Sequence, residues 1–152
     1  MEVFVSFQYI IQAILFSILL IIISVIDVRN REIPPIYCVT IALCSVLDFK
    51  VANLLGLGIA LILWVCAAFI CPNMLGGGDI KLTAAVSLVL GFTATAYGII
   101  IGFTLELICF SVIKHQKKLS EQEAKNYSMP LAPFLSIGSL TTYFINLGGL
   151  SI

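Results

Sequence analysis

Charged residues are scarce in this sequence. Of its 152 residues only 11% are Asp, Glu, Lys or Arg, whereas an average soluble domain contains roughly 25%. Hydrophobic residues make up 61%, and a small soluble domain has too much surface for its size to bury so many apolar side chains. Soluble, disordered and coiled-coil classes are therefore excluded. Because eight acidic residues balance eight basic ones, the basic surplus of a nucleic-acid-binding protein is missing too, and we expect no nucleic-acid partner.

Clustered metal ligands and an evident nucleophile are also missing. The chain has five cysteines but no CxxC pair, and its one histidine, His115, lies in a basic loop. Zinc sites usually need clustered cysteine and histidine ligands. No cysteine or serine stands where a nucleophile would be expected. We therefore expect neither a metal nor another cofactor.

Long uninterrupted apolar runs are what the sequence has instead. A helix needs about 20 residues to cross the hydrocarbon core of a membrane, and membrane-spanning strands would alternate apolar and polar residues, which these runs do not. We predict an all-α polytopic membrane protein, a single domain over residues 1–152 with about six transmembrane helices. The expected spans are 7–26, 36–47, 54–70, two short helices within 82–113 that separate near 91–97, and 131–147.

The basic residues predict the orientation in the membrane. With six spans, seven of the eight Lys and Arg residues fall in loops on one side, and only Lys50 lies opposite. Basic loops remain in the cytoplasm, so this side of the cell membrane is expected to be the cytoplasmic one. The seven residues are Arg29, Arg31, Lys81, Lys114, Lys117, Lys118 and Lys125.

Two aspartates occupy unusual positions. Asp27 directly follows the first apolar run, and Asp79 opens a later one. Charged groups at membrane depth are costly and by default mark function. A helix N-terminus favours an acid, which could explain Asp79 without any function, but Asp27 stands at the C-terminal end of its helix, where an anion is disfavoured. An even number of crossings separates the two aspartates, so we expect both on the cytoplasmic side.

Three glycines precede the second aspartate. Gly76, Gly77 and Gly78 have no β-carbon, so the backbone there can adopt positive φ angles and approach another chain closely. We expect this turn to let an extended substrate peptide lie against a carboxylate, although a flexible link between helices would also use glycine. The pattern GxGD is weak by itself.

Three segments together resemble a known family. Gly76-Gly-Gly-Asp-Ile-Lys-Leu82 resembles the GxGD segment of type IV prepilin peptidases and the related archaeal preflagellin peptidases. Asp27-Val-Arg-Asn-Arg-Glu-Ile-Pro34 resembles their other aspartate segment, and Met129-Pro-Leu-Ala-Pro-Phe-Leu135 resembles the proline-containing start of their last helix. The three occur in the same order on the expected spans and cover most of the chain.

The resemblance implies an intramembrane aspartyl endopeptidase with Asp27 and Asp79 as its catalytic pair. Such enzymes remove a short, positively charged leader from pilin-like precursor proteins at the cytoplasmic face of the membrane. Two carboxylates close together share one proton, so the ionised one can activate water while the protonated one donates to the scissile carbonyl.

The chain departs from the family pattern in two places. Many bacterial members carry an additional N-terminal region with cysteine pairs that serves N-methylation, and this sequence begins directly at the peptidase core. We therefore do not expect methyltransferase activity. Pro35 also stands where family members often have Asn.

Two further charged residues are secondary candidates, and they leave an alternative function open. Lys81 could tune Asp79 or contact an acidic group of the substrate, although an interfacial anchor is the commoner role for such a lysine. Glu106 is the one acid deep inside an apolar run. In a small ion or proton transporter, Asp27, Asp79 and Glu106 would form a relay. Relays usually place acids near the membrane midplane, whereas two of these three are expected at one edge.

Overall fold

The computed structural model describes residues 2–70, 76–117 and 129–147, and within these ranges the chain is helical with no strand. The first helix is α1 (Glu2–Asn30), followed by α2 (Pro35–Cys44) with a 3-10 turn at Ser45–Asp48. A 3-10 turn at Val51–Gly56 leads into α3 (Leu57–Val65), which ends in a π-turn at Cys66–Ile70. The remaining helices are α4 (Gly77–Leu90), α5 (Phe92–Lys117) and α7 (Ala132–Leu147).

Three of these stretches are long and apolar enough to cross a membrane. They are Phe7–Asn30, Val51–Phe69 and Phe92–Lys117, and Pro35–Asp48 is a shorter apolar helix. Many large apolar side chains on them are exposed, for example Ile21 at 57% and Leu61 at 63%, as expected of surfaces that face lipid. The prediction of an all-α membrane protein is confirmed.

The expected split of 82–113 is right in position but wrong in the lengths of the two helices. The break falls at Gly91, whose φ of 79° lies in the left-handed region that favours glycine. After it, α5 continues for 26 residues as one long helix rather than a short one. Its glycines do not break it, because Gly98 and Gly102 lie in close contact with α7 and stay helical.

The backbone carbonyl groups near the end of α4 accept hydrogen bonds from a residue that was not among the candidates named from the sequence. Asn53 donates hydrogen bonds from Nδ2 to the carbonyl oxygens of Leu88 and Val89, at 3.1 and 3.2 Å. The last carbonyls of a helix lack partners within the helix, and leaving them unpaired is costly away from water. Asn53 therefore fixes the start of the third span against the end of α4.

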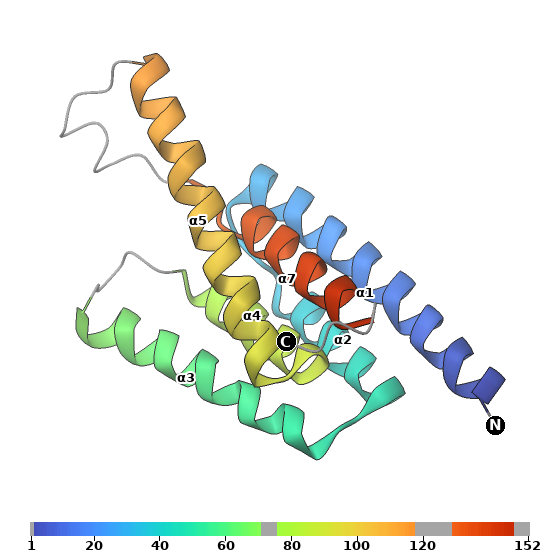
Figure 1. Ribbon diagram of the computed structural model, residues 1–152. Coiled ribbons are helices and arrows are strands. Elements are labelled where there is room, and N and C mark those ends of the chain that lie inside the picture. Colours follow the sequence, from blue (N-terminus) through green and yellow to red (C-terminus); the bar gives the residue numbers. More distant parts are fainter. Residues whose placement is uncertain (1, 71–75, 118–128, 148–152) are drawn as a thin grey trace.

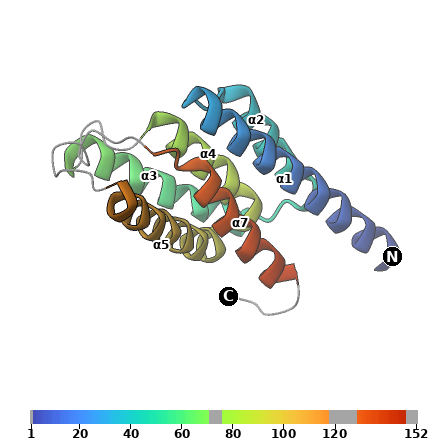
Figure 2. The ribbon, with the colours of Figure 1, turned by 90° about the horizontal axis from the view of Figure 1, so that it is seen from above.

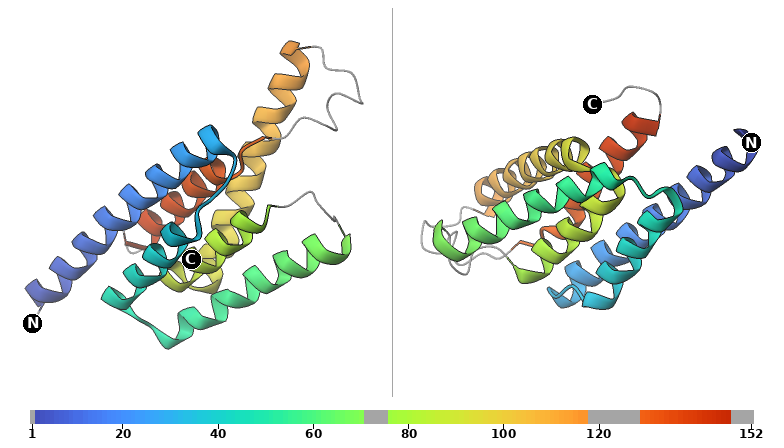
Figure 3. Two further views of the ribbon diagram at one scale, coloured as in Figure 1. Left: turned by 180° about the vertical axis from the view of Figure 1, so that it is seen from behind. Right: turned by 90° about the horizontal axis from the view of Figure 1, so that it is seen from below.

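Helix α4 lies at the centre of the bundle. It contacts α2, α3, α5 and α7. Most of its residues from Leu82 onwards are buried, and Leu82 and Val86 lie in the core. In Figure 2, α7 lies between α1 and α5, and these three helices form one layer. Helix α3 lies beyond α4 on the side away from α1, as Figures 1 and 3 show.

Helices α1 and α7 run antiparallel and are joined by polar contacts along their length. The Tyr143 hydroxyl donates to Oε1 of Gln12 at 3.2 Å, and the hydroxyls of Ser24 and Ser136 lie 3.0 Å apart. Because lipid offers no hydrogen-bonding partner, polar side chains in a membrane bundle are stable when they pair with one another. These pairs fix the register of the two helices.

The contact between α5 and α7 depends on glycine. A β-carbon at Gly138 would overlap the carbonyl oxygen of Gly98, and one at Gly102 would lie 3.0 Å from the carbonyl oxygen of Phe134. Small residues let two membrane helices approach until their backbones touch, which maximises van der Waals contact. This packing holds α7, including its first turn, at a defined place in the bundle.

Candidate active site

The two predicted aspartates line one cavity, which has a volume of about 290 Å³. It lies at the end of the bundle where α1 ends and where α4 begins. The walls come from the turn after α1 and from the start of α4. The lining residues are Asp27, Arg31, Glu32, Ile33, Gly76, Gly77, Gly78, Asp79 and Lys81.

The Asp27 carboxylate is held by the start of α7. Its Oδ2 accepts a hydrogen bond of 3.0 Å from the backbone N–H of Ala132, and the residue is only 6% exposed. Pro133 has no N–H, while the N–H groups of Phe134 and Leu135 already bond to the carbonyl oxygen of Leu131. The Ala132 N–H is thus the donor of this first turn that has no partner within the helix. An acid that is misplaced at the end of α1 is well placed at the start of α7, where the helix dipole favours an anion.

The end of α1 bends so that this carboxylate faces the cavity. Arg31 has a φ of 54°, and its N–H donates a hydrogen bond of 2.8 Å to the carbonyl oxygen of Asp27. A residue in this left-handed conformation commonly ends a helix. The chain then turns towards Ile33, whose side chain packs against Gly78: a β-carbon there would lie 3.0 Å from Cβ of Ile33. The first aspartate segment and the GxGD segment are therefore in direct contact.

The Asp79 carboxylate is held at the start of its own helix. Gly76 is the N-cap of α4 and Asp79 lies three positions later, where an acid can reach back to the N-cap N–H. Asp79 is half-buried and lies outside the three long spans. Burial in the first place, and the negative charges of Asp27 and Glu106 in addition, raise its pKa to about 7, although a hydrogen bond from the Gly76 backbone acts to lower it. Near neutral pH Asp79 can therefore hold a proton that an ordinary aspartate would have lost.

The backbone conformation of the three glycines before Asp79 differs from the expectation. Gly76 has a φ of −68°, and Gly77 and Gly78 form the first turn of α4 rather than a loop with positive φ angles. Their small size still matters at two positions. A β-carbon at Gly76 would lie 2.9 Å from Oδ2 of Asp79, and one at Gly78 would press on Ile33, whereas one at Gly77 would meet nothing within 4 Å. The glycines thus make room for a carboxylate and for the neighbouring segment.

The secondary candidates differ in their relation to the cavity. Lys81 lines it with an exposed side chain. Glu106 on α5 is half-buried and is not a lining residue, although its charge acts on Asp79. Among the described residues, no three His, Cys, Asp or Glu side chains are grouped as a metal site would need.

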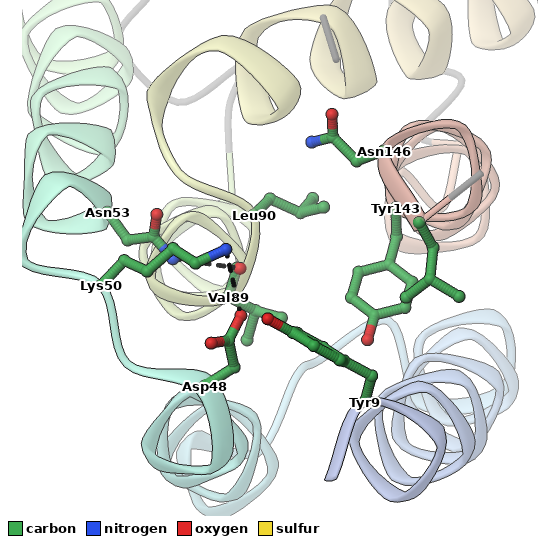
Figure 4. A pocket seen from close by; sticks show the side chains of 9 residues that line it. Tyr9, Asp48, Lys50, Asn53, Val89, Leu90, Tyr143 and Asn146 are labelled. Atoms are coloured by element: carbon green, nitrogen blue, oxygen red, sulfur yellow. Dashed lines mark hydrogen bonds and ion pairs between the residues drawn. The ribbon is translucent and has the colours of Figure 1, made fainter. Parts of the chain in front are cut away.

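A larger cavity of about 410 Å³ lies at the opposite end of the bundle. Its lining comes from the start of α1, the end of α4 and the end of α7, and Figure 4 shows Tyr9, Asp48, Lys50 and Tyr143 around it. Nζ of Lys50 and Oδ2 of Asp48 are 3.3 Å apart. Leu90 also lines this cavity, and it lies about 17 Å from Asp79 along the axis of α4.

The fold and the site define a class: a helical membrane protein with two carboxylates in one cavity at an end of the bundle. Residues 14–111 match the model of the type IV leader peptidase family, so the chain belongs to this family and the resemblance found in the sequence is confirmed. The chain is 31% identical to the prepilin leader peptidase/N-methyltransferase of Bacillus subtilis (strain 168), over 86% of this chain and 54% of that protein. The chain thus spans about half the length of this relative. No solved structure matches it significantly.

The contact between Asp27 and α7 predicts an effect on stability. Asp27→Ala leaves the buried Ala132 N–H without a partner, which we expect to lower the free energy of unfolding by about 1 kcal/mol or more. Asp27→Asn keeps a side-chain oxygen that can accept the bond and should be closer to the wild type. The melting temperature of the purified protein in detergent micelles measures both.

A suitable control is Asp48→Ala, which removes a partly exposed ion pair with Lys50 that contributes at most about 1 kcal/mol. If Asp27→Ala melted at or above the temperature of this control, the bond to α7 would not stabilise the bundle.

Proposed function

We propose that this protein is an intramembrane aspartyl endopeptidase that removes the leader of pilin-like precursor proteins, with Asp27 and Asp79 as its catalytic pair. The observation that carries the proposal is that these two acids, far apart in the sequence and on different helices, line the same cavity. Family membership supports the peptidase activity, and the name of the Bacillus subtilis relative supports prepilin as the substrate.

The surroundings of the two acids support a division of roles between them. Asp27 accepts a backbone hydrogen bond at the positive end of α7, which stabilises a negative charge there and offsets part of the cost of burying it. Asp79, with its pKa of about 7, holds the shared proton. Asp27 would take a proton from water as the water oxygen attacks the scissile carbonyl, while Asp79 would donate its proton to the carbonyl oxygen. Asp27 would then transfer its proton to the leaving amine as the C–N bond breaks, and Asp79 would take back a proton from a hydroxyl of the intermediate, which completes hydrolysis and restores both carboxyl groups.

The orientation in the membrane belongs to the same proposal. Arg29, Arg31 and Lys81 lie at the end of the bundle that holds the two aspartates, and Lys50 lies at the other end. Lys118 and Lys125 are outside the described residues. This distribution favours a cell-membrane protein whose active site faces the cytoplasm, surrounded by lipid along its spans. A single peptidase domain over residues 1–152 remains part of the proposal. The name of the relative also includes an N-methyltransferase, an activity to which no feature of this site points.

Substitution of either aspartate tests the catalytic pair. We expect Asp27→Asn and Asp79→Asn each to abolish leader removal while the protein still inserts, because neither amide can exchange a proton as a carboxyl group does. The measurement is co-expression with candidate pilin-like precursors from the same genome, followed by mass spectrometry of the mature N-terminus. Full processing by either purified single variant would defeat the assignment.

The pKa of Asp79 predicts how cleavage depends on pH. If Asp79 must be protonated, activity is present below its pKa and is lost as the pH rises through about 7, by about tenfold per unit above it. Glu106→Gln removes a nearby negative charge, so this loss should move to lower pH. Initial rates between pH 5 and 9 at constant ionic strength measure both effects, and a rate that stays constant up to pH 9 contradicts the role of Asp79 as the acid.

The glycines allow a comparison between neighbouring positions. Gly76→Ala would displace the Asp79 carboxylate, and we expect cleavage to fall by about tenfold to a hundredfold, since small misplacements of a catalytic group have effects of this size. Gly77→Ala has free space and should keep cleavage within about twofold of the wild type. Single-turnover rates and melting temperatures of both variants provide the test. Equal losses would show that flexibility of the whole segment is what matters.

A further inference from the structure

The cavity at the end of the bundle opposite to the aspartates takes no part in the reaction proposed above. Its volume of about 410 Å³ lies within the range of small-molecule sites, roughly 300–1,000 Å³. Four parts of the chain that are distant in the sequence meet around it: the start of α1, the segment between α2 and α3, the end of α4 and the end of α7. A molecule held in this cavity would contact all four of them.

The lining residues place this cavity at the boundary between the membrane and water. The candidate span Phe7–Asn30 begins two residues before Tyr9, and the span Val51–Phe69 begins directly after Lys50. Tyrosine and lysine side chains at the ends of spans combine an apolar body with a polar tip, and they lie at the level of the lipid headgroups. The cavity therefore lies at the depth at which phospholipid headgroups are found.

Charges of both signs line one side of the cavity. The carboxylate of Asp48 and the ammonium group of Lys50 are 3.3 Å apart, and their side chains are 28% and 61% exposed, so a ligand can reach both. A partly exposed ion pair contributes at most about 1 kcal/mol, so replacing part of it by contacts with a ligand costs little. A carboxylate accepts hydrogen bonds from an ammonium group, and a lysine binds phosphate. The pair matches a ligand that carries both an ammonium and a phosphate group.

Two tyrosines line the side of the cavity towards α1 and α7. Figure 4 shows Tyr9 of α1 and Tyr143 of α7 around the same space as Asp48 and Lys50. Tyr143 is only 6% exposed, and its hydrogen bond to Gln12 fixes its hydroxyl. Tyrosine rings attract cations through their faces, and hydroxyl oxygens accept hydrogen bonds from ammonium groups. Together with Asp48, the tyrosines therefore provide a place for the ammonium group of the ligand.

Apolar side chains surround these polar groups on the side of the lipid. Leu147 in the lining is 48% exposed. Phe49 and Val51, the neighbours of Lys50 in the sequence, are 51% and 73% exposed. A ligand in this cavity therefore continues from polar groups onto an apolar surface. A lipid headgroup with its acyl chains fits this arrangement better than a free polar solute, which has nothing to place against the apolar side chains.

We propose that this cavity binds the headgroup of a zwitterionic phospholipid with a primary ammonium group, such as phosphatidylethanolamine. The ammonium group lies among Asp48, Tyr9 and Tyr143, where its N–H groups donate to the carboxylate, and the phosphate lies against Lys50. The bound lipid joins the ends of α1, α4 and α7 and stabilises the bundle, because a ligand of the folded state opposes unfolding. In the orientation proposed above, this lipid belongs to the outer leaflet. The inference does not depend on the peptidase activity.

Melting temperatures of the purified full chain in detergent micelles test the proposal. We expect phosphatidylethanolamine to raise the melting temperature by about 5 °C. Phosphatidylglycerol, which lacks the ammonium group, should give less than half of this shift at the same mole fraction. Glycerophosphoethanolamine has the same headgroup without acyl chains and separates a lipid from a free solute, so it too should give less than half. An equal shift with either of these two compounds overturns the proposal.

Substitutions locate the effect in the cavity. Lys50→Gln and Tyr9→Leu should each remove at least half of the shift produced by phosphatidylethanolamine. The matched controls are Lys114→Gln, at an exposed lysine near the other end of the bundle, and Tyr97→Leu, at a tyrosine that is 47% exposed and does not line the cavity. Both controls should keep the full shift. A full shift in either cavity variant, or an equal loss in the controls, contradicts the assignment.

Native mass spectrometry of the wild type provides a measurement that needs no variant. After removal of lipid, the protein is returned to micelles that contain equal amounts of phosphatidylethanolamine and phosphatidylglycerol. We expect one molecule of phosphatidylethanolamine to remain bound, about fivefold or more in excess over phosphatidylglycerol. Retention of both lipids in equal amounts would show only the general lipid surface of a membrane protein and would overturn the proposal.

Discussion

The hydrogen bond between the Asp27 carboxylate and the Ala132 N–H joins the first described helix to the last. In a bundle surrounded by lipid, a free N–H at a helix start and a free carboxylate at a helix end are both unfavourable. Here each satisfies the other. The bond gives an acid at the wrong end of α1 a favourable position, and it fixes the start of α7 beside the cavity. The paired serines and the contact of Gln12 with Tyr143 continue the same antiparallel register towards the other end.

The cavity is asymmetric because its two acids meet different helix starts. Asp27 lies against the start of a helix from elsewhere in the chain, while Asp79 lies in the first turn of its own helix. Two helix N-termini near two carboxylates offset part of the repulsion between them. Since Asp79 is raised to a pKa of about 7, the pair can hold one proton and one negative charge at neutral pH, which is the state that acid–base hydrolysis of a peptide bond requires.

The glycines and alanines of α4 shape the surface beside the two aspartates. Gly76 leaves space for the Asp79 carboxylate, and Gly78 lets the segment around Ile33 approach. Further along the helix, Ala84 and Ala85 line a neighbouring apolar groove between α4 and α2. One helix therefore contributes an acid of the proposed catalytic pair at its start and an apolar wall beyond it, so the polar and apolar hollows lie next to each other.

Much of this could be predicted from the sequence, because it depends on properties of short segments. Uninterrupted apolar runs determine helices in a membrane, a glycine near residue 91 determines a break, and the scarcity of charge makes Asp27 and Asp79 conspicuous. The count of crossings even places both aspartates at one end. The partner of Asp27 lies 105 positions away, however, and nothing local to either residue indicates it.

Only the tertiary structure decided the single long α5, the helical backbone of Gly77 and Gly78, the role of Asn53 at the end of α4, and the groove beside the aspartates. Each of these depends on which surfaces come into contact, and contact between distant segments depends on the packing of the whole bundle.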